Sequence, residues 1–306
     1  AYTKNNWSLS AFGRAQPNQY HRVQERLPEL RFDLLPVVLP GGFAECASAS
    51  AAVLQADAFG LDPEVRTQRL DAYYGLSRPL SPAPWFTFTP VAGARVTHYT
   101  DARGGKNDYT RTLGEVGFDA RLLASGTFDY KNAVWEIDGL RHLVEPRLSY
   151  RYAPEAERGR AYIPAVDRRA FSTYLAPLSL GDARFLDELG PLNTLRLSLG
   201  NTLQTRDPAY GSRNLASLNF AADYRFDHPG QRPLSDLYTE FALTPAPWLR
   251  WEVFHRIDPH ASRHRQPVEN PVIQIRIQHV AVFLILAQVA IGDPVGILSG
   301  QCREHL

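Results

Sequence analysis

Two groups of side chains contain the residue types that hydrolysis or metal chemistry would need. Ser149, His142 and Asp167 could supply a nucleophile, a base and an orienting acid. Ser149 and His142 are an odd number of residues apart in an alternating segment, so a strand would send their side chains to opposite faces. No G-x-S-x-G or G-x-x-x-x-G-K-[ST] motif is present. We therefore predict neither a Ser-His-Asp site nor a nucleotide site.

The second group contains His255, His260 and His264, with Asp258 between them. Two His residues four positions apart share a metal ion when a helix places them on one face. Pro259 and the strand pattern before it oppose a helix, so we expect a solvated loop. We predict no metal, no cofactor and no enzymatic activity; a β-rich hydrolase, on a barrel or in a soluble protein, is the alternative.

The composition excludes some classes of partner and compartment. The chain has 306 residues, 33 basic and 32 acidic, and this balance does not favour a nucleic-acid partner. The two cysteines, Cys46 and Cys302, are too few for a zinc site; we expect unpaired thiols, with a bridge as the alternative in an oxidising compartment. The chain contains no Met and begins directly with a strand-like segment, so we expect a piece of a longer protein.

Alternation of apolar and polar residues is the dominant pattern, over segments of roughly ten residues. Leu195, Leu197 and Leu199 alternate with Arg196 and Ser198, and five other segments behave in the same way. Their apolar members include Leu30, Phe32, Leu70, Tyr74, Val116, Phe118, Phe220, Tyr224, Leu249 and Trp251. Each strand would therefore have one apolar face and one charged face.

The length of these segments favours a membrane barrel over a soluble sandwich. Sandwich strands average about 5–6 residues, whereas a tilted membrane-spanning strand needs about 9–11. Tyr150, Tyr152, Trp248 and Trp251 lie near strand ends, where interfacial aromatic girdles occur. We predict an all-β, antiparallel transmembrane β-barrel with a polar interior; a soluble β-sandwich or propeller is the alternative.

Several motifs, in their order along the chain, resemble one known family. The stretch LRHLVEPRLSYRYAPE at residues 140–155 is similar to a His-x-x-x-Pro-x-x-x-Tyr-x-Tyr strand of the LPS-assembly outer-membrane protein family LptD, also called organic solvent tolerance protein. The other matching stretches are QERLPELRFDLLPVVL, RLDAYYGLSRPL, WFTFTPVAGARVTHYTD, YIPAVDRRAF and NTLRLSLGNTLQTR. The resemblance covers residues 7–258.

The resemblance implies a very large antiparallel barrel in the outer membrane of a Gram-negative bacterium. Members receive lipopolysaccharide from periplasmic bridge proteins and insert it into the outer leaflet, and a lipoprotein partner plugs the lumen. The lipid is thought to leave sideways between the first and last strands, which needs a weakly paired seam. A general porin or channel would share the alternation without that seam.

The chain departs from the family pattern in its length and at its end. We expect barrel strands over 1–262, roughly 12–14 of them, which is part of a larger barrel. The family's periplasmic N-terminal domain and cysteine pairs are not reproduced. Residues 153–190 read as a long loop insert partly ordered over the sheet, with a short helix or turn at 182–189. The tail at 263–306 is atypical, with an apolar run at 280–287; a strand buried on both faces or a non-native sequence would explain it.

Charged residues on the polar faces have two interpretations. Arg95, Arg121, Arg147 and Arg225 could contact the phosphates or sugar acids of a lipopolysaccharide head group, because a guanidinium fork suits phosphate. Alternatively, they pair with the acidic residues Glu115, Asp119, Glu145 and Asp223 in a wet interior. Pro90 and Pro146 lie within strand patterns, where they would mark bulges or strand ends.

Overall fold

The computed structural model describes residues 1–18, 23–57, 64–156, 160–167, 174–226, 232–246, 249–259 and, for the backbone, 273–278. The described chain forms one antiparallel sheet and one turn of 3-10 helix, η1 (Leu186–Glu188). The strands are β1 (Tyr2–Lys4), β2 (Trp7–Arg14), β3 (Glu25–Leu39), β4 (Phe43–Ala56), β5 (Val65–Ser77), β6 (Leu80–Ala83), β7 (Phe86–Thr100), β8 (Asp108–Leu122), β9 (Ala124–Asn132), β10 (Ile137–Ala153), β11 (Leu192–Asp207), β12 (Gly211–Arg225), β13 (Leu237–Ala246), β14 (Leu249–Ile257) and β15 (Ile273–Gln278).

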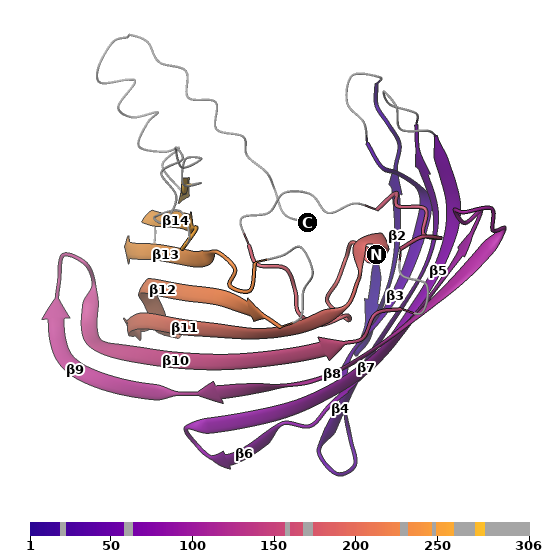
Figure 1. Ribbon diagram of the computed structural model, residues 1–306. Coiled ribbons are helices and arrows are strands. Elements are labelled where there is room, and N and C mark those ends of the chain that lie inside the picture. Colours follow the sequence, from indigo (N-terminus) through magenta and orange to yellow (C-terminus); the bar gives the residue numbers. More distant parts are fainter. Residues whose placement is uncertain are drawn as a thin grey trace, which may run out of the picture.

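Neighbours in the sheet are neighbours along the chain, as in a meander. The order runs from β1 to β15, with β6 and β9 beside this path because they continue β5 and β8. Several strands have 14 to 17 residues, which is longer than the strands of most sandwiches. The sheet curves strongly and is open, with β1 and β15 at its edges (Figure 1). The prediction of an antiparallel, partial barrel is confirmed.

The two ends of the strands differ in their connections. At one end the strands are joined by short turns, such as Pro40–Gly42, where Gly41 and Gly42 have φ of 82° and 77°. At the other end the connections are longer, and the longest joins Ala153 of β10 to Leu192 of β11. Short turns at one rim and long loops at the other are typical of outer-membrane barrels.

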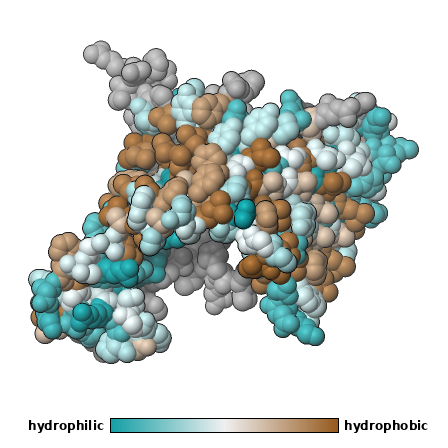
Figure 2. Space-filling model, turned by 90° about the horizontal axis from the view of Figure 1, so that it is seen from below, coloured by the Kyte–Doolittle hydropathy of each residue, from teal (hydrophilic) through white to brown (hydrophobic). Residues whose placement is uncertain are grey.

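The two faces of the sheet have the reverse of a soluble protein's polarity. On β5, Leu70 is 57% exposed whereas its neighbour Arg69 is 1% exposed. Leu197 and Trp251 are likewise 56% and 46% exposed, so no second layer of the described chain covers them. Figure 2, which views the sheet from below, shows hydrophobic residues over much of this face. We call it the outer face, and the opposite one, which bears Arg69, the inner face.

The long connection between β10 and β11 lies on the concave side of the sheet (Figure 1). Its described parts, 160–167 and 174–191, are called the inner loop below. Val166 packs with Leu54 of β4, and Leu180 packs with Tyr73 of β5 and Leu113 of β8. In its described parts the segment lies over the sheet, and its one turn of 3-10 helix, η1, falls within 182–189.

The prediction that Pro90 and Pro146 mark bulges or strand ends is wrong. Both lie inside β7 and β10, with no register shift where they pair with Phe118 and Leu199. They instead interrupt a neighbouring strand, because a proline has no N–H to donate. The Arg78 amide donates to the Pro90 carbonyl at 3.1 Å, but no donor returns, and β5 ends there before β6 begins. Pro146 lies in the same way beside the break between β8 and β9.

The C-terminal part of the chain is described only in small part. β15 lies within the tail that begins at residue 263, and its backbone pairs antiparallel with β14. The apolar run 280–287 and Cys302 lie outside the described residues, so the pairing of Cys46 with Cys302 stays open. Among the described residues, the structure contains no helix with the length and apolarity that crossing a membrane requires.

Candidate functional site: the inner face and its loop

Charged and hydroxyl side chains line the inner face of three adjacent strands and are buried beneath the inner loop. They come from alternate positions of β5, β7 and β8, because alternation sends every second residue inward. The buried set is Thr67, Arg69, Asp71, Arg95, Thr97, Tyr99, Arg111 and Glu115. Buried charges are costly unless they are paired, so the contacts of this wall determine what it can do.

Two carboxylates of the inner loop form the first contact with the wall, the aspartate anchor. The Arg69 guanidinium lies 3.0 Å from Asp167 Oδ2 and 2.9 Å from Asp187 Oδ1. The Tyr99 hydroxyl donates to Asp187 Oδ1 at 3.0 Å. The other Asp187 oxygen accepts from the backbone amides of Val166 and Asp167 at 3.1 and 2.7 Å, which ties two parts of the loop together.

Two further guanidiniums complete the aspartate anchor. Arg26 Nη2 lies 2.7 Å from Asp167, and Arg111 Nη2 donates to the carbonyl of Leu186 at 2.7 Å. Burial raises the pKa of the Asp167 carboxyl, and the charges of Arg69 and Arg26 act in the opposite direction. A loop carboxylate at this depth therefore depends on the guanidiniums that face it.

The second contact, the glutamate anchor, has the opposite polarity. Glu115 of β8 supplies the acceptors, and the donors are the Tyr73 hydroxyl at 2.8 Å, the Ser179 hydroxyl at 2.9 Å and the Leu180 amide at 2.8 Å. Here the wall carries the negative charge and the loop contributes neutral donors. The glutamate anchor therefore fixes 179–180 without any charge on the loop.

Three glycines make room for the Tyr73 ring. A Cβ atom at Gly75 or Gly93 would lie 2.5 or 2.6 Å from the Tyr73 hydroxyl oxygen, and one at Gly181 would lie 2.6 Å from its ring. Gly75 and Gly93 are directly opposite each other on β5 and β7. Any side chain at these positions would therefore displace the ring from Glu115.

A third contact comes from β11. Arg196 binds both oxygens of Asp223, at 2.7 and 2.9 Å, and its Nη2 also donates to the carbonyl of Ala176 at 2.6 Å. Asp223 is one of the predicted acidic partners, but the guanidinium that it binds belongs to Arg196, which is not one of the four predicted arginines. The inner loop is thus held by strands on both sides of β10.

Arg95, the first predicted head-group residue, lies deep in the wall. Its side chain is 1% exposed, its Nε is 3.7 Å from Asp71, and its guanidinium lies 5.4 Å from the centre of the Tyr73 ring. Within the described residues, Arg95 Nε and Nη1 have no hydrogen-bond partner. Arg95 therefore has two nitrogen donors without a hydrogen bond in a fully buried position.

The structure brings two of the other predicted arginines together. Arg121 of β8 and Arg147 of β10 are directly opposite each other, and both form ion pairs with Glu145. Their side chains are 48% and 56% exposed on the inner face. Arg225 of β12 is elsewhere on the inner face and donates to the carbonyl of Arg232 at 3.2 Å. The four predicted residues therefore do not form one cluster.

Of the predicted acidic partners, Glu145 pairs with two of the predicted arginines, whereas Asp119 and Glu115 do not. Asp119 binds Arg151, with Nη2 at 2.7 Å, and Glu115 binds no guanidinium in the described part of the chain. From the sequence, Asp167 is a candidate only as a triad member, and Asp187, Arg69 and Arg111 are not among the candidate site residues. The alternation does assign Arg69 to the polar face, but the residues that meet it lie 98 and 118 positions away.

The structure does not assemble the catalytic groups considered above. Asp167 is engaged by Arg69 and Arg26, away from Ser149 and His142 of β10. Among the described residues, no group of three or more His, Cys, Asp or Glu side chains is placed to hold a metal ion. His260 and His264 lie outside the described residues.

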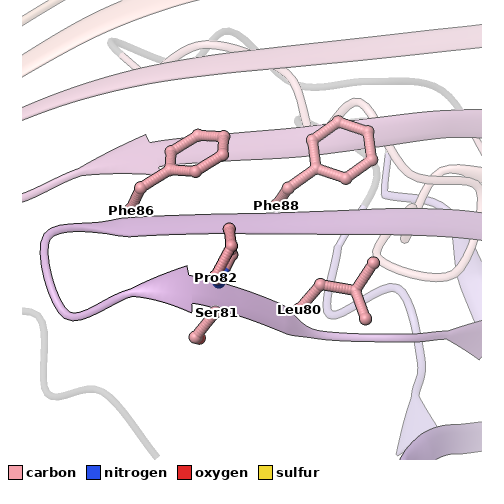
Figure 3. A pocket seen from close by; sticks show the side chains of 5 residues that line it. All are labelled: Leu80, Ser81, Pro82, Phe86 and Phe88. Atoms are coloured by element: carbon pink, nitrogen blue, oxygen red, sulfur yellow. The ribbon is translucent and has the colours of Figure 1, made fainter.

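An apolar depression of about 530 Å³ lies at the β6–β7 hairpin. Its lining residues are Leu80, Ser81, Pro82, Phe86 and Phe88 (Figure 3). Phe88 is in ring contact with Phe118, with centroids 5.4 Å apart, and Phe118 with Tyr150 at 5.9 Å. These aromatic rings continue across the outer face, where interfacial aromatics occur in membrane barrels.

Comparison with known proteins decides the family. The model of the family LptD, LPS transport system D, matches residues 2–253. The chain belongs to this family. It is 29% identical over 223 residues to LPS-assembly protein LptD of Paracidovorax citrulli (strain AAC00-1) and 29% identical over 231 residues to that of Acidovorax sp. (strain JS42). These matches cover 69% and 72% of the chain, and the chain spans 26% of the length of each relative. The predicted membership of the LptD family is confirmed.

Proposed function

We propose that this chain is part of the outer-membrane barrel that inserts lipopolysaccharide into the outer leaflet. The observation that carries the proposal is the reversed polarity of the sheet in a member of the LptD family. The exposed outer face suits lipid, and the charged inner face suits a wet interior through which a polar head group can pass. The process is transport and insertion, without covalent catalysis.

The asymmetry of the connections supports an orientation. Short turns face the periplasm and long loops face the outside in barrels of this kind. The inner loop then covers the interior from the external side. The edges at β1 and β15 are available for further strands, which fits a chain whose match covers only 26% of the length of each relative.

The partners that we propose follow from the family resemblance. Lipopolysaccharide arrives from periplasmic bridge proteins, and a plug lipoprotein occupies the lumen beside the concave face. Arg121 and Arg147 are the most accessible candidates for head-group contact, since one carboxylate, Glu145, serves two guanidiniums. Arg95 is covered by the inner loop, and Arg225 lies on the opposite side of β10.

Photo-crosslinking in the full-length protein tests this function. A photoreactive residue at position 121 or 147 should form an adduct with lipopolysaccharide in growing cells, and the adduct should disappear when lipopolysaccharide synthesis stops. Solute permeation without any adduct would favour a porin. Ester or glycan hydrolysis by the purified protein, abolished by a single substitution, would favour a hydrolase.

A further inference from the structure

We propose that the aspartate anchor occupies an anion-binding site, and that a phosphate group takes this site when the inner loop leaves it. The phosphate source that we infer, the head group of lipopolysaccharide, rests on the proposed function. Asp167 and Asp187 would then act as an internal substitute for the ligand, keeping the loop docked until the ligand arrives.

The charges of the site match a doubly charged anion. At the aspartate anchor the strands contribute three guanidiniums and one carboxylate: Arg26, Arg69, Arg111 and Glu29. The inner loop adds the two carboxylates of the aspartate anchor, which makes the docked cluster neutral. Without the loop, the wall has an excess of two positive charges. A phosphate monoester carries a charge of about −1.5 to −2 at pH 7.

The hydrogen-bonding groups of the wall match phosphate as well. Arg69 donates to both loop carboxylates through a single nitrogen, Nη1. Arg111 donates through Nη1 and Nη2 to the loop carbonyls of Leu189 and Leu186. All of these donors become free when the loop leaves. Guanidiniums bind phosphate oxygens in paired, charge-assisted hydrogen bonds.

Arg95 is the observation that points to a further ligand for this cluster. A cluster evolved only for stability would satisfy its buried donors, because an unpaired donor costs about 1–3 kcal/mol. Arg95 is fully buried, yet two of its nitrogens have no hydrogen-bond partner within the described residues. Arg95 is two positions along β7 from Thr97, the residue opposite Arg111, and we infer that its free donors lie beside the space that an anion would enter.

The two anchors respond differently to an anion. Phosphate competes with the aspartate anchor, where the loop is negative and the wall positive. It has no reason to compete at the glutamate anchor, where the wall is negative and the loop neutral. The expected motion is therefore release of 160–167 and 186–189 while 179–180 stays attached.

The test is a distance measurement on the full-length protein in its complex. Spin labels at Arg184 of the inner loop and Val96 of β7, both exposed, report loop release, with Cys46 and Cys302 replaced by Ser. Three probes are compared: lipopolysaccharide with its phosphates, the same material after phosphatase treatment, and inorganic phosphate. Phosphorylated lipopolysaccharide should move the labels apart and dephosphorylated material should not. Release by inorganic phosphate as well would support the anion site and show that the lipid portion is not needed.

Three variants make the result specific. Arg95→Gln should raise the lipopolysaccharide concentration for half-maximal release by about tenfold, the effect of losing one charge-assisted hydrogen bond. Arg206→Gln, an exposed arginine near the turn end of β11, is the matched control and should change nothing. The double variant Asp167→Asn with Asp187→Asn should show released loop without any phosphate.

Failure of this inference is distinct from failure of the proposed function. If lipopolysaccharide crosslinks at position 121 or 147 but all probes leave the loop docked, transport stands and the anion site is wrong. Equal release by phosphorylated and dephosphorylated material, or an unchanged response of Arg95→Gln, overturns the site too. If no crosslink forms, the spin-label distance in inorganic phosphate alone tests the anion site. A loop that stays docked at saturating phosphate rejects the site.

Discussion

At the scale of single residues, Glu115 combines several roles in one carboxylate. It accepts from the Tyr73 hydroxyl, the Ser179 hydroxyl and the Leu180 amide. In Glu115→Gln one acceptor oxygen becomes an NH₂ donor that faces other donors. We expect docking of the inner loop to weaken by about 1–3 kcal/mol.

Hydrogen exchange at the Leu180 amide measures this change, because that amide is protected only while the loop is docked. Asp129→Asn, at an exposed position of β9, is the matched loss of a carboxylate and should leave the exchange unchanged. Equal protection of Leu180 in the parent protein and in Glu115→Gln would show that the hydrogen bond does not hold the loop.

The glycines around Tyr73 allow a second prediction at this scale. A Cβ at Gly93 would lie 2.6 Å from the Tyr73 hydroxyl oxygen and 2.9 Å from Glu115, whereas a Cβ at Gly114 of β8 would meet no atom within 4 Å. Gly93→Ala should therefore lower the unfolding free energy by about 1–3 kcal/mol through overpacking. Gly114→Ala should have little effect on it.

Denaturant titration of the protein in detergent or lipid compares the two variants. Adding Tyr73→Phe to Gly93→Ala removes the hydroxyl that the new methyl group contacts, so part of the lost stability should return. A Gly114→Ala variant as unstable as Gly93→Ala would contradict the close packing around Tyr73.

At the scale of elements, the prolines divide strands that the sequence pattern would leave continuous. Pro90 accepts a hydrogen bond from Arg78 but cannot return one. Pro90→Ala supplies that donor, so β5 and β6 should join, with a gain of about 0.5–1.5 kcal/mol for one hydrogen bond. Hydrogen exchange of the Arg78 amide should slow. Pro154→Ala, in an exposed loop position, controls for the change in unfolded-chain entropy.

The same scale shows what sequence could and could not predict. Period-two alternation was enough to assign Leu70 and Leu197 to one face and Arg69 and Arg196 to the other, because that assignment is local. The aspartate anchor was not predictable, since the inner loop has no periodicity and its contacts with Arg69 span 98 and 118 residues. Pro146 was recognised as a ladder defect, but which strand would break depended on pairing that a single sequence does not specify.

At the scale of the whole molecule, the reversed polarity makes a prediction about neighbouring positions. Leu197 and Ser198 of β11 point to the outer and inner faces, respectively. In a bilayer, an arginine on the lipid face near the midplane costs about 2–4 kcal/mol, and one facing a wet lumen costs much less. Leu197→Arg should therefore reduce barrel stability and assembly in the outer membrane far more than Ser198→Arg. Comparable tolerance of both substitutions in urea unfolding from lipid vesicles would reject the membrane-facing assignment.

The pocket that holds the Tyr73 ring also acts as a check on strand alignment. Gly75 and Gly93 lie opposite each other only in the native pairing of β5 with β7. A slip by two residues, the smallest that keeps the faces correct, would bring Val91 or Arg95 to the place of Gly93. The Tyr73 ring would then have no room, and Glu115 would lose its hydrogen bond from the Tyr73 hydroxyl. The inner loop could then not dock at the glutamate anchor. A barrel with misaligned strands would thus stay open on the side of its long loops. Its undocked inner loop would distinguish it from a correctly paired barrel before either one transports lipid.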